Sequence, residues 1–296
     1  MTTEAYAVAS NYLVAAATGV LALAFIAHVA EWALGRRSAL VTTGGDEHQQ
    51  PSVAPDIAAG IGRSVATLGA LLLLAGAVSR GLAAERVPWG NMYEFGCAAS
   101  LIVLVGYLVL VRRWGREIDW AGAAVMGFVT VVLGASMLVY VPAGPLVPAL
   151  HSYWLVIHVF AAMLAGSGFT IGAIASAAYL LKARNENALP RTPSAARLDE
   201  IAFRVNAFAF PIWTFAALIA GPIWAQYAWG RYWGWDPKEV WAFITWVVYA
   251  GYLHARATVG WRGRAAAILC LVGFATFLFN FIGVNLFVGG LHSYAK

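Results

Sequence analysis

The chain has 296 residues, of which 61% are hydrophobic and only 11% are charged, and its formal net charge is +5. Soluble domains carry about 25% charged residues. This composition therefore excludes a soluble fold and predicts an integral membrane protein. The positive net charge gives no support to nucleic-acid binding, because the charges lie in short loops between apolar runs.

Eight apolar runs approach or exceed the roughly 20 residues that a helix needs to cross a bilayer. In chain order they are Tyr12–Leu34, Ala59–Ala83, Phe95–Val111, Ala121–Val141, Tyr153–Leu181, Val205–Trp224, Val240–Leu253 and Ala265–Val288. Pro211 is expected to kink the sixth run, and the seventh is short unless its flanking residues are added. The sequence thus predicts one all-α membrane domain over residues 1–296, a polytopic bundle of about eight transmembrane helices.

Lysine and arginine are unevenly divided between the two sets of alternating loops. The set that includes both termini holds only five of the 19: Arg80, Arg86, Arg231, Lys238 and Lys296. Cytoplasmic loops are the ones enriched in these residues. We therefore predict a multi-pass protein of the cell (plasma) membrane with cytoplasmic loops at 35–58 and 183–203. Both termini and the segment 225–239 are then extracytoplasmic.

The stretch from Trp229 to Glu239 is unusually aromatic, with three tryptophans, a tyrosine and two glycines between two apolar runs. This density exceeds what anchoring at a membrane surface requires. Asp236 followed by proline and, three residues on, by Glu239 predicts a capping box that starts a new helix. Trp233 and Trp235 are two residues apart, so an extended backbone would place both rings on one side. We interpret the stretch as a flat aromatic platform; a capped helix with interfacial anchors is the alternative.

Three histidines lie at depths that matter for function. His158 and His292 come from different runs but share the outer level of the tryptophan-rich stretch, whereas His254 closes the seventh run on the cytoplasmic side. Ionisable residues within a membrane are functional candidates by default. Two imidazoles beside an aromatic surface favour a planar, metal-centred ligand such as haem, with Arg231 or Lys238 available for its propionates. Zinc would prefer three or four ligands, and simple hydrogen bonding between helices also stays open.

The other histidines and the two cysteines have plainer interpretations. His48 and His151 are expected to be solvated loop residues, and His28 is expected to bond a neighbouring helix. Cys97 and Cys270 lie at or inside apolar runs, and no CxxC or metal-type spacing is present. Both cysteines are expected to be small buried residues.

The tryptophan-rich stretch, continued to His254, resembles the WWD signature of haem-handling membrane proteins. It is most similar to the CcsA/ResC family (named CcsB in some bacteria), a subunit of the system II cytochrome c synthase. Two further stretches carry the resemblance, Leu150–Val159 and Gly283–Tyr294, together with Pro88 and Asn91–Glu94. The likeness covers roughly residues 65 to 296.

The resemblance implies a role for each histidine that matches the family's pattern. His158 and His292 would be the axial ligands of an external haem, and His254 would bind a haem inside the membrane. The opposing ligand of that inner haem would come from a ResB-like partner subunit, although His28 at a similar depth stays open. The haem-presenting residues would be Trp229, Trp233, Trp235 and Asp236, with no catalytic residue separate from the haem site.

The resemblance also implies the reaction and the partners. Haem b would be relayed as cargo from the inner to the outer site, where thiols of an apocytochrome c CxxCH segment add to its vinyl groups. A thioredoxin-like protein would keep those thiols reduced, since this chain has no CxxC. Three alternatives stay open: a haem or small-molecule transporter without ligation activity, an assembly subunit without a cofactor, and a bis-histidine electron-transfer cytochrome.

Overall fold

The computed structural model describes residues 2–43, 52–146 and 150–292, which form α- and π-helices joined by loops. The N-terminal half contains α1 (Thr3–Thr43), α2 (Ala54–Ala84), α3 (Met92–Trp114), α4 (Arg116–Asp119) and α5 (Gly122–Leu138). The C-terminal half contains α6 (Tyr153–Arg184), α7 (Ala195–Phe215), η2 (Ala216–Ala220), α8 (Gly221–Trp229), α9 (Pro237–His254), η3 (Ala255–Val259), α10 (Arg264–Leu278), η4 (Phe279–Gly283) and α11 (Val284–Phe287).

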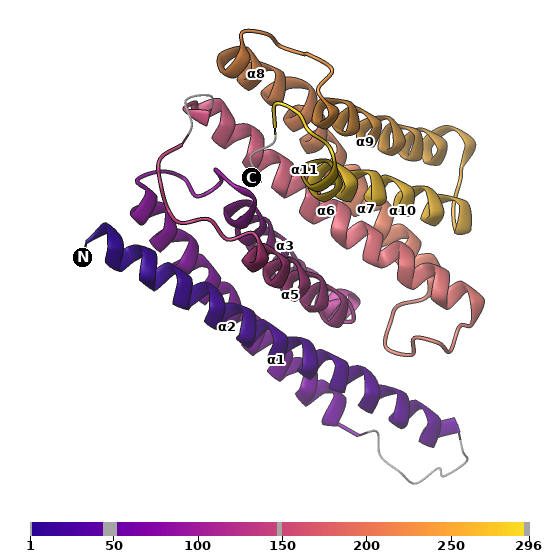
Figure 1. The fold of residues 1–296 in the computed structure, drawn as a ribbon. Coiled ribbons are helices and arrows are strands. Elements are labelled where there is room, and N and C mark those ends of the chain that lie inside the picture. The colour runs from indigo at the N-terminus through magenta and orange to yellow at the C-terminus, as the bar shows by residue number, and fades with distance from the viewer. Residues whose placement is uncertain (1, 44–51, 147–149, 293–296) are drawn as a thin grey trace.

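The helices form an elongated bundle in which α6 is central. In Figure 1, α1 and α2 lie along one side, α9 and α10 lie along the opposite side, and α6 runs between them. One apolar core fills the N-terminal half around Leu104 and Met126. A second core, which includes Phe169 and Trp213, joins α6 to α7, α9 and α10. The site described below lies at the end of the bundle where α6 and α9 begin.

Seven helical segments in the described part of the chain are long and apolar enough to cross a membrane. They correspond to every predicted run except the seventh, which forms α9. This helix has only 18 residues and begins with the charged Lys238 and Glu239, so it is shorter than the seven segments. The prediction of an all-α, multi-pass membrane protein is confirmed. The side of the membrane on which the termini lie stays a prediction.

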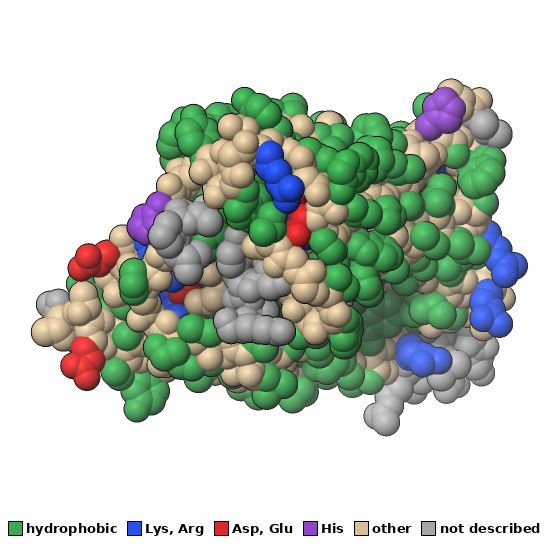
Figure 2. All heavy atoms as spheres, turned by 45° about the horizontal axis from the view of Figure 1, so that its top comes forward, with side chains coloured by type: hydrophobic (Ala, Val, Ile, Leu, Met, Phe, Trp, Pro, Cys, Tyr) green, Lys and Arg blue, Asp and Glu red, His purple; other side chains and the backbone are tan. Residues whose placement is uncertain are grey.

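The outer surface fits contact with lipid. Large apolar side chains such as Leu138 and Tyr12 are 87% and 74% exposed. Figure 2 shows hydrophobic side chains over most of the visible face and few charged ones. A soluble monomer does not expose apolar surface on this scale.

The two predicted cytoplasmic loops are shorter in the structure than in the sequence analysis. α1 continues to Thr43 and α2 begins at Ala54, while His48 lies outside the described residues. The second loop extends only from the end of α6 at Arg184 to the N-cap of α7 at Ser194. Arg191 in this loop bonds Glu31 at 3.0 Å, which ties the loop to α1.

Pro211 lies inside α7, as its place in the sixth run predicted. The helix continues past it and changes to the π-helix η2 at Ala216. π-helical turns recur at functional sites, and each of the three in the described part of the chain contains or contacts a residue considered below. η2 contacts His158, η3 follows His254 directly, and η4 supplies Asn280 to the cavity.

Candidate functional site

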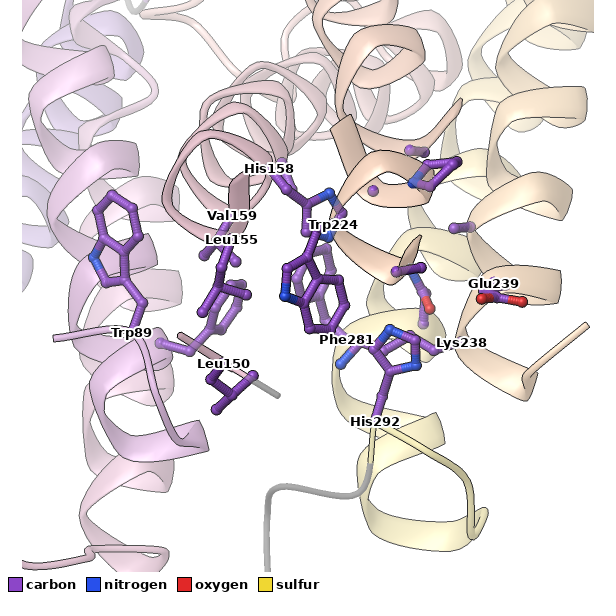
Figure 3. A pocket seen from close by; sticks show the side chains of 18 of the residues that line it. Trp89, Leu150, Leu155, His158, Val159, Trp224, Lys238, Glu239, Phe281 and His292 are labelled. Atoms are coloured by element: carbon purple, nitrogen blue, oxygen red, sulfur yellow. The ribbon is translucent and has the colours of Figure 1, made fainter. Parts of the chain in front are cut away.

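A cavity opens at the end of the bundle where α6 and α9 begin. Its volume is about 130 Å³, which is below the range of pockets that hold drug-sized ligands, so a ligand of that size would need lining side chains to move. Most of its lining is aromatic or aliphatic, and a few polar groups converge on it. The residues that the following paragraphs use include Trp89, Leu150, His158, Trp224, Lys238 and His292 (Figure 3).

His158 stands on the second turn of α6 with its ring held by one backbone contact. Its Nδ1 lies 2.9 Å from the carbonyl oxygen of Ala216, the first residue of η2. A carbonyl oxygen can only accept a hydrogen bond, so Nδ1 must carry the proton. The lone pair therefore resides on Nε2, which makes this imidazole a competent metal ligand.

His292 is oriented by a carboxylate. Its Nδ1 lies 2.7 Å from Oδ2 of Asp236, whose Oδ1 accepts the Leu291 N–H at 2.8 Å. The chain approaches Asp236 so closely here that a Cβ on Gly290 would lie 2.7 Å from Oδ1. A carboxylate behind a ligating imidazole fixes the tautomer and raises the basicity of the ligand.

Charge in this pair follows from burial and hydrogen bonding. Burial raises the pKa of Asp236, but the hydrogen bonds from His292 and Leu291 outweigh it and hold the pKa below its ordinary value. Burial also lowers the pKa of His292, against the opposing effect of Asp236. At neutral pH the pair is therefore a carboxylate and a neutral imidazole, the form that binds metal.

Trp224 lies between the two imidazoles. Its ring is stacked on His158 at 5.9 Å and 8°, and it meets His292 at 5.5 Å and 59°. Figure 3 shows the indole between them, and it is only 2% exposed. Two imidazoles that bind one iron face each other with only the metal between their nitrogens. This indole must therefore move before His158 and His292 can share an iron.

Part of the tryptophan-rich stretch lines the cavity, but the stretch is not flat. Trp229 packs on His292 at 4.7 Å and 75°, and Trp233 lines the cavity. Trp235 meets Trp233 at 88° and is 69% exposed. Its φ of 57° lies in the left-handed region, which interrupts the extended backbone. The two rings lie close together, with centroids 5.8 Å apart, but their perpendicular planes do not form the flat platform that was expected.

The predicted capping box at the start of α9 is confirmed. Asp236 accepts the Lys238 N–H at 3.4 Å, and Glu239 Oε2 accepts the Asp236 N–H at 3.0 Å. Glu239 also accepts the Gly234 N–H at 2.8 Å. Asp236 thus has two functions, because the same carboxylate caps α9 and holds His292.

His254 lies at the opposite end of α9, about 27 Å from Asp236 at 1.5 Å per residue. It is exposed on the outside of the bundle. His28 is fully buried on α1, bonds Glu31 at 3.0 Å, and fits against Gly62 of α2. α1 and α9 lie on opposite sides of the molecule (Figure 1). The structure therefore does not bring His28 and His254 together, and the option of an intrachain pair is removed.

His151 lies outside the cavity, as expected. It is exposed and contacts the carbonyl oxygen of Leu146 through Nε2 at 3.2 Å. Within the described residues, His, Cys, Asp and Glu form no group of three or more that could hold a metal ion. The zinc alternative thus lacks the ligand set that zinc prefers.

Sequence reasoning missed several residues that line the cavity. Trp224 was counted as the end of an apolar run, and Trp89 lay just outside the quoted motif residues. Trp213 and Asn280 lie within predicted spans, where a lining residue cannot be told from a core residue without the packing of the helices. The polar amides in the eighth run were the one available signal.

Comparison with known proteins is consistent with this arrangement. Residues 89–292 match the family model for the cytochrome C assembly protein. The chain is 35% identical over 272 residues to the cytochrome c biogenesis protein CcsA of Synechococcus sp. (strain CC9902), covering 82% of this chain and 89% of that protein. It is 37% identical over 217 residues to CcsA of Chlamydomonas reinhardtii, covering 70% and 60%. The matched region contains the whole cavity, and the chain belongs to the cytochrome c assembly protein family.

Proposed function

We propose that this chain binds haem b at the cavity, with His158 and His292 as axial ligands, and presents it for attachment to apocytochrome c. The observation that carries the proposal is the pair of imidazoles at one aromatic cavity, each with Nδ1 held by an acceptor. That arrangement leaves the lone pair of each ring on Nε2. Membership of a cytochrome c assembly family supports haem as the ligand.

Bound haem supplies an iron for the two imidazoles and two vinyl groups, across which the S–H bonds of a CxxCH segment add to form thioethers. The chain itself orients the cargo and limits access of water. Trp233 lines the cavity, Trp229 packs on His292, and Asp236 bonds His292, so these three are the residues that would support the haem and its ligand. Trp235, which is largely exposed, is placed to meet the incoming apocytochrome.

We also propose an inner haem site at His254. Its imidazole is exposed on the outside of the bundle, where a helix of a ResB-like partner can supply the opposing ligand. With the segment 225–239 extracytoplasmic, haem would move outward through the plasma membrane from His254 to the cavity. A thioredoxin-like reductant would act on the apocytochrome at the same face.

Replacing His254 by alanine is expected to lower the haem content of the outer site in cells, because supply from the inner site is interrupted. The measurement is haem per protein in the complex purified with its partner. As a control, haem added to the purified variant should bind the outer site as it does in the unaltered protein. Unchanged haem content in cells would contradict the relay.

Replacing Trp224 by leucine is expected to speed haem binding several-fold. The indole fills the space between the two imidazoles, so only the fraction of molecules in which it has moved can bind. Stopped-flow absorbance after mixing with haem measures the rate. Trp246→Leu is the matched control, since it removes a packed indole that does not line the cavity. Slower binding in Trp224→Leu would show that the ring supports haem and does not block it.

A further inference from the structure

Among the described residues that line the cavity, Lys238 is the one lysine or arginine. Its hydrogen-bond partner is neutral. Its Nζ donates to Oδ1 of Asn285 at 3.1 Å and lies 5.8 Å from the ring of Phe281. Among the described residues, no carboxylate lies within the 4.0 Å of an ion pair with it. Arg231, the other cation considered from the sequence, is exposed and does not line the cavity.

Two buried polar atoms close to the same phenylalanine have no hydrogen-bond partner. They are Nε1 of Trp213 and Oδ1 of Asn280, in side chains that are 2% and 3% exposed and line the cavity. The Trp213 ring lies 6.4 Å from that of Phe281. Buried polar atoms are rarely left unpaired, so these two point to a polar group of a ligand. The amide of Asn280 can present oxygen or nitrogen, because the two orientations are not distinguished by shape.

We propose that Lys238, Trp213 and Asn280 form a carboxylate-binding corner that receives the propionate edge of the haem. This inference rests on the proposed function and adds the orientation of the cargo. The ammonium, the indole N–H and the amide N–H₂ are all donors, which is what a carboxylate requires. Charge assistance makes the lysine contact the strongest of them.

The corner determines which edge of the haem faces outward. Lys238 and Phe281 lie on one side of the cavity and Trp89 lies on the other (Figure 3). With the propionates held at the corner, the remainder of the ring, including its vinyl groups, extends toward Trp89. Thiols from an apocytochrome can then reach the vinyl groups without crossing the bundle.

Haem and haem dimethyl ester distinguish this orientation, because the ester lacks the two carboxylates. The complex purified with its partner should bind haem about tenfold more tightly than the ester. In Lys238→Gln this preference should fall to about twofold through weaker haem binding, while ester affinity stays the same. Arg231→Gln, which removes an exposed cation of the same segment, should keep the full preference.

If Lys238→Gln prefers haem over the ester as strongly as the unaltered protein does, the proposed orientation of the haem is wrong. Loss of this preference in Arg231→Gln would also overturn it. The spectrum of bound haem keeps this result separate from the proposed function. A bis-histidine spectrum with an unchanged preference refutes the corner alone. Absence of that spectrum in the unaltered protein refutes the proposed function itself.

The preference for haem over its ester should also depend on pH. Burial lowers the pKa of Lys238, which precedes the predicted span, to about 8, although Asp236 acts in the opposite direction. The ammonium is thus present below pH 8 and lost above it, so the preference should shrink as pH rises through about 8. The other titratable groups that line the cavity are Tyr232, Glu239, His158 and His292. A preference that is constant from pH 7 to pH 9.5 would contradict the assignment to Lys238.

Discussion

Alanine at both His158 and His292 is expected to abolish the bis-histidine haem spectrum of the outer site and to stop cytochrome c maturation. Each ring is held through Nδ1, by Ala216 or by Asp236, so that Nε2 carries the lone pair. Loss of a supporting group alone costs about 10–100-fold in metal affinity. Loss of the ligands themselves should therefore reduce haem affinity on the order of 100-fold or more.

Two controls make that result specific. Glycine variants of His158 and His292 should recover a low-spin spectrum when imidazole is added, because the free ligand fills the space of the lost ring. His151→Ala should behave as the unaltered protein, since His151 is exposed outside the cavity. Full haem content and normal maturation in the double alanine variant would refute the assignment of the ligands.

Asparagine at Asp236 is expected to weaken haem binding at the outer site by about 10–100-fold. The carboxylate holds Nδ1 of His292 at 2.7 Å and accepts the Leu291 N–H at 2.8 Å. Asparagine still caps a helix well, so the start of α9 should be retained. What is lost is the anionic acceptor that fixes the tautomer of His292. A titration with haem followed by absorbance measures the change.

Glu239→Gln is the matched control for Asp236→Asn. Glu239 belongs to the same capping box and bonds the Asp236 and Gly234 N–H groups, but it does not contact His292. Glutamine also serves at this position of a capping box. The haem affinity of the Glu239→Gln variant should change little. Equal losses in the two variants would attribute the effect to the stability of α9.

Much of the fold follows from local features of the sequence. Long apolar runs predicted the spanning helices, because a backbone inside lipid must satisfy its own hydrogen bonds. Asp236 and Glu239 predicted the start of α9, since a capping box involves only neighbouring residues. The sequence also predicted that His158 and His292 lie at the same depth, because each is near the outer end of an apolar run that must span the bilayer.

The remaining features of the site depend on how the helices pack against one another, which the sequence does not show. Whether Trp224 lies between the imidazoles depends on how α8 meets α6 and the C-terminal segment. His28 and His254 have similar predicted depths, but the helices that carry them, α1 and α9, lie on opposite sides of the bundle, which depth alone cannot reveal. The left-handed backbone at Trp235 was also not predicted, because a tryptophan rarely adopts it; here the Gly234 and Asp236 N–H groups on either side both bond Glu239.

The most direct test of the central claim is an absorption spectrum of the complex purified with its partner, recorded in the oxidised and reduced states. The proposed function predicts a low-spin, bis-histidine spectrum that survives in His254→Ala after haem is added and disappears when His158 and His292 are both replaced. Purified complex without haem, or a spectrum unaffected by loss of both residues, would contradict it.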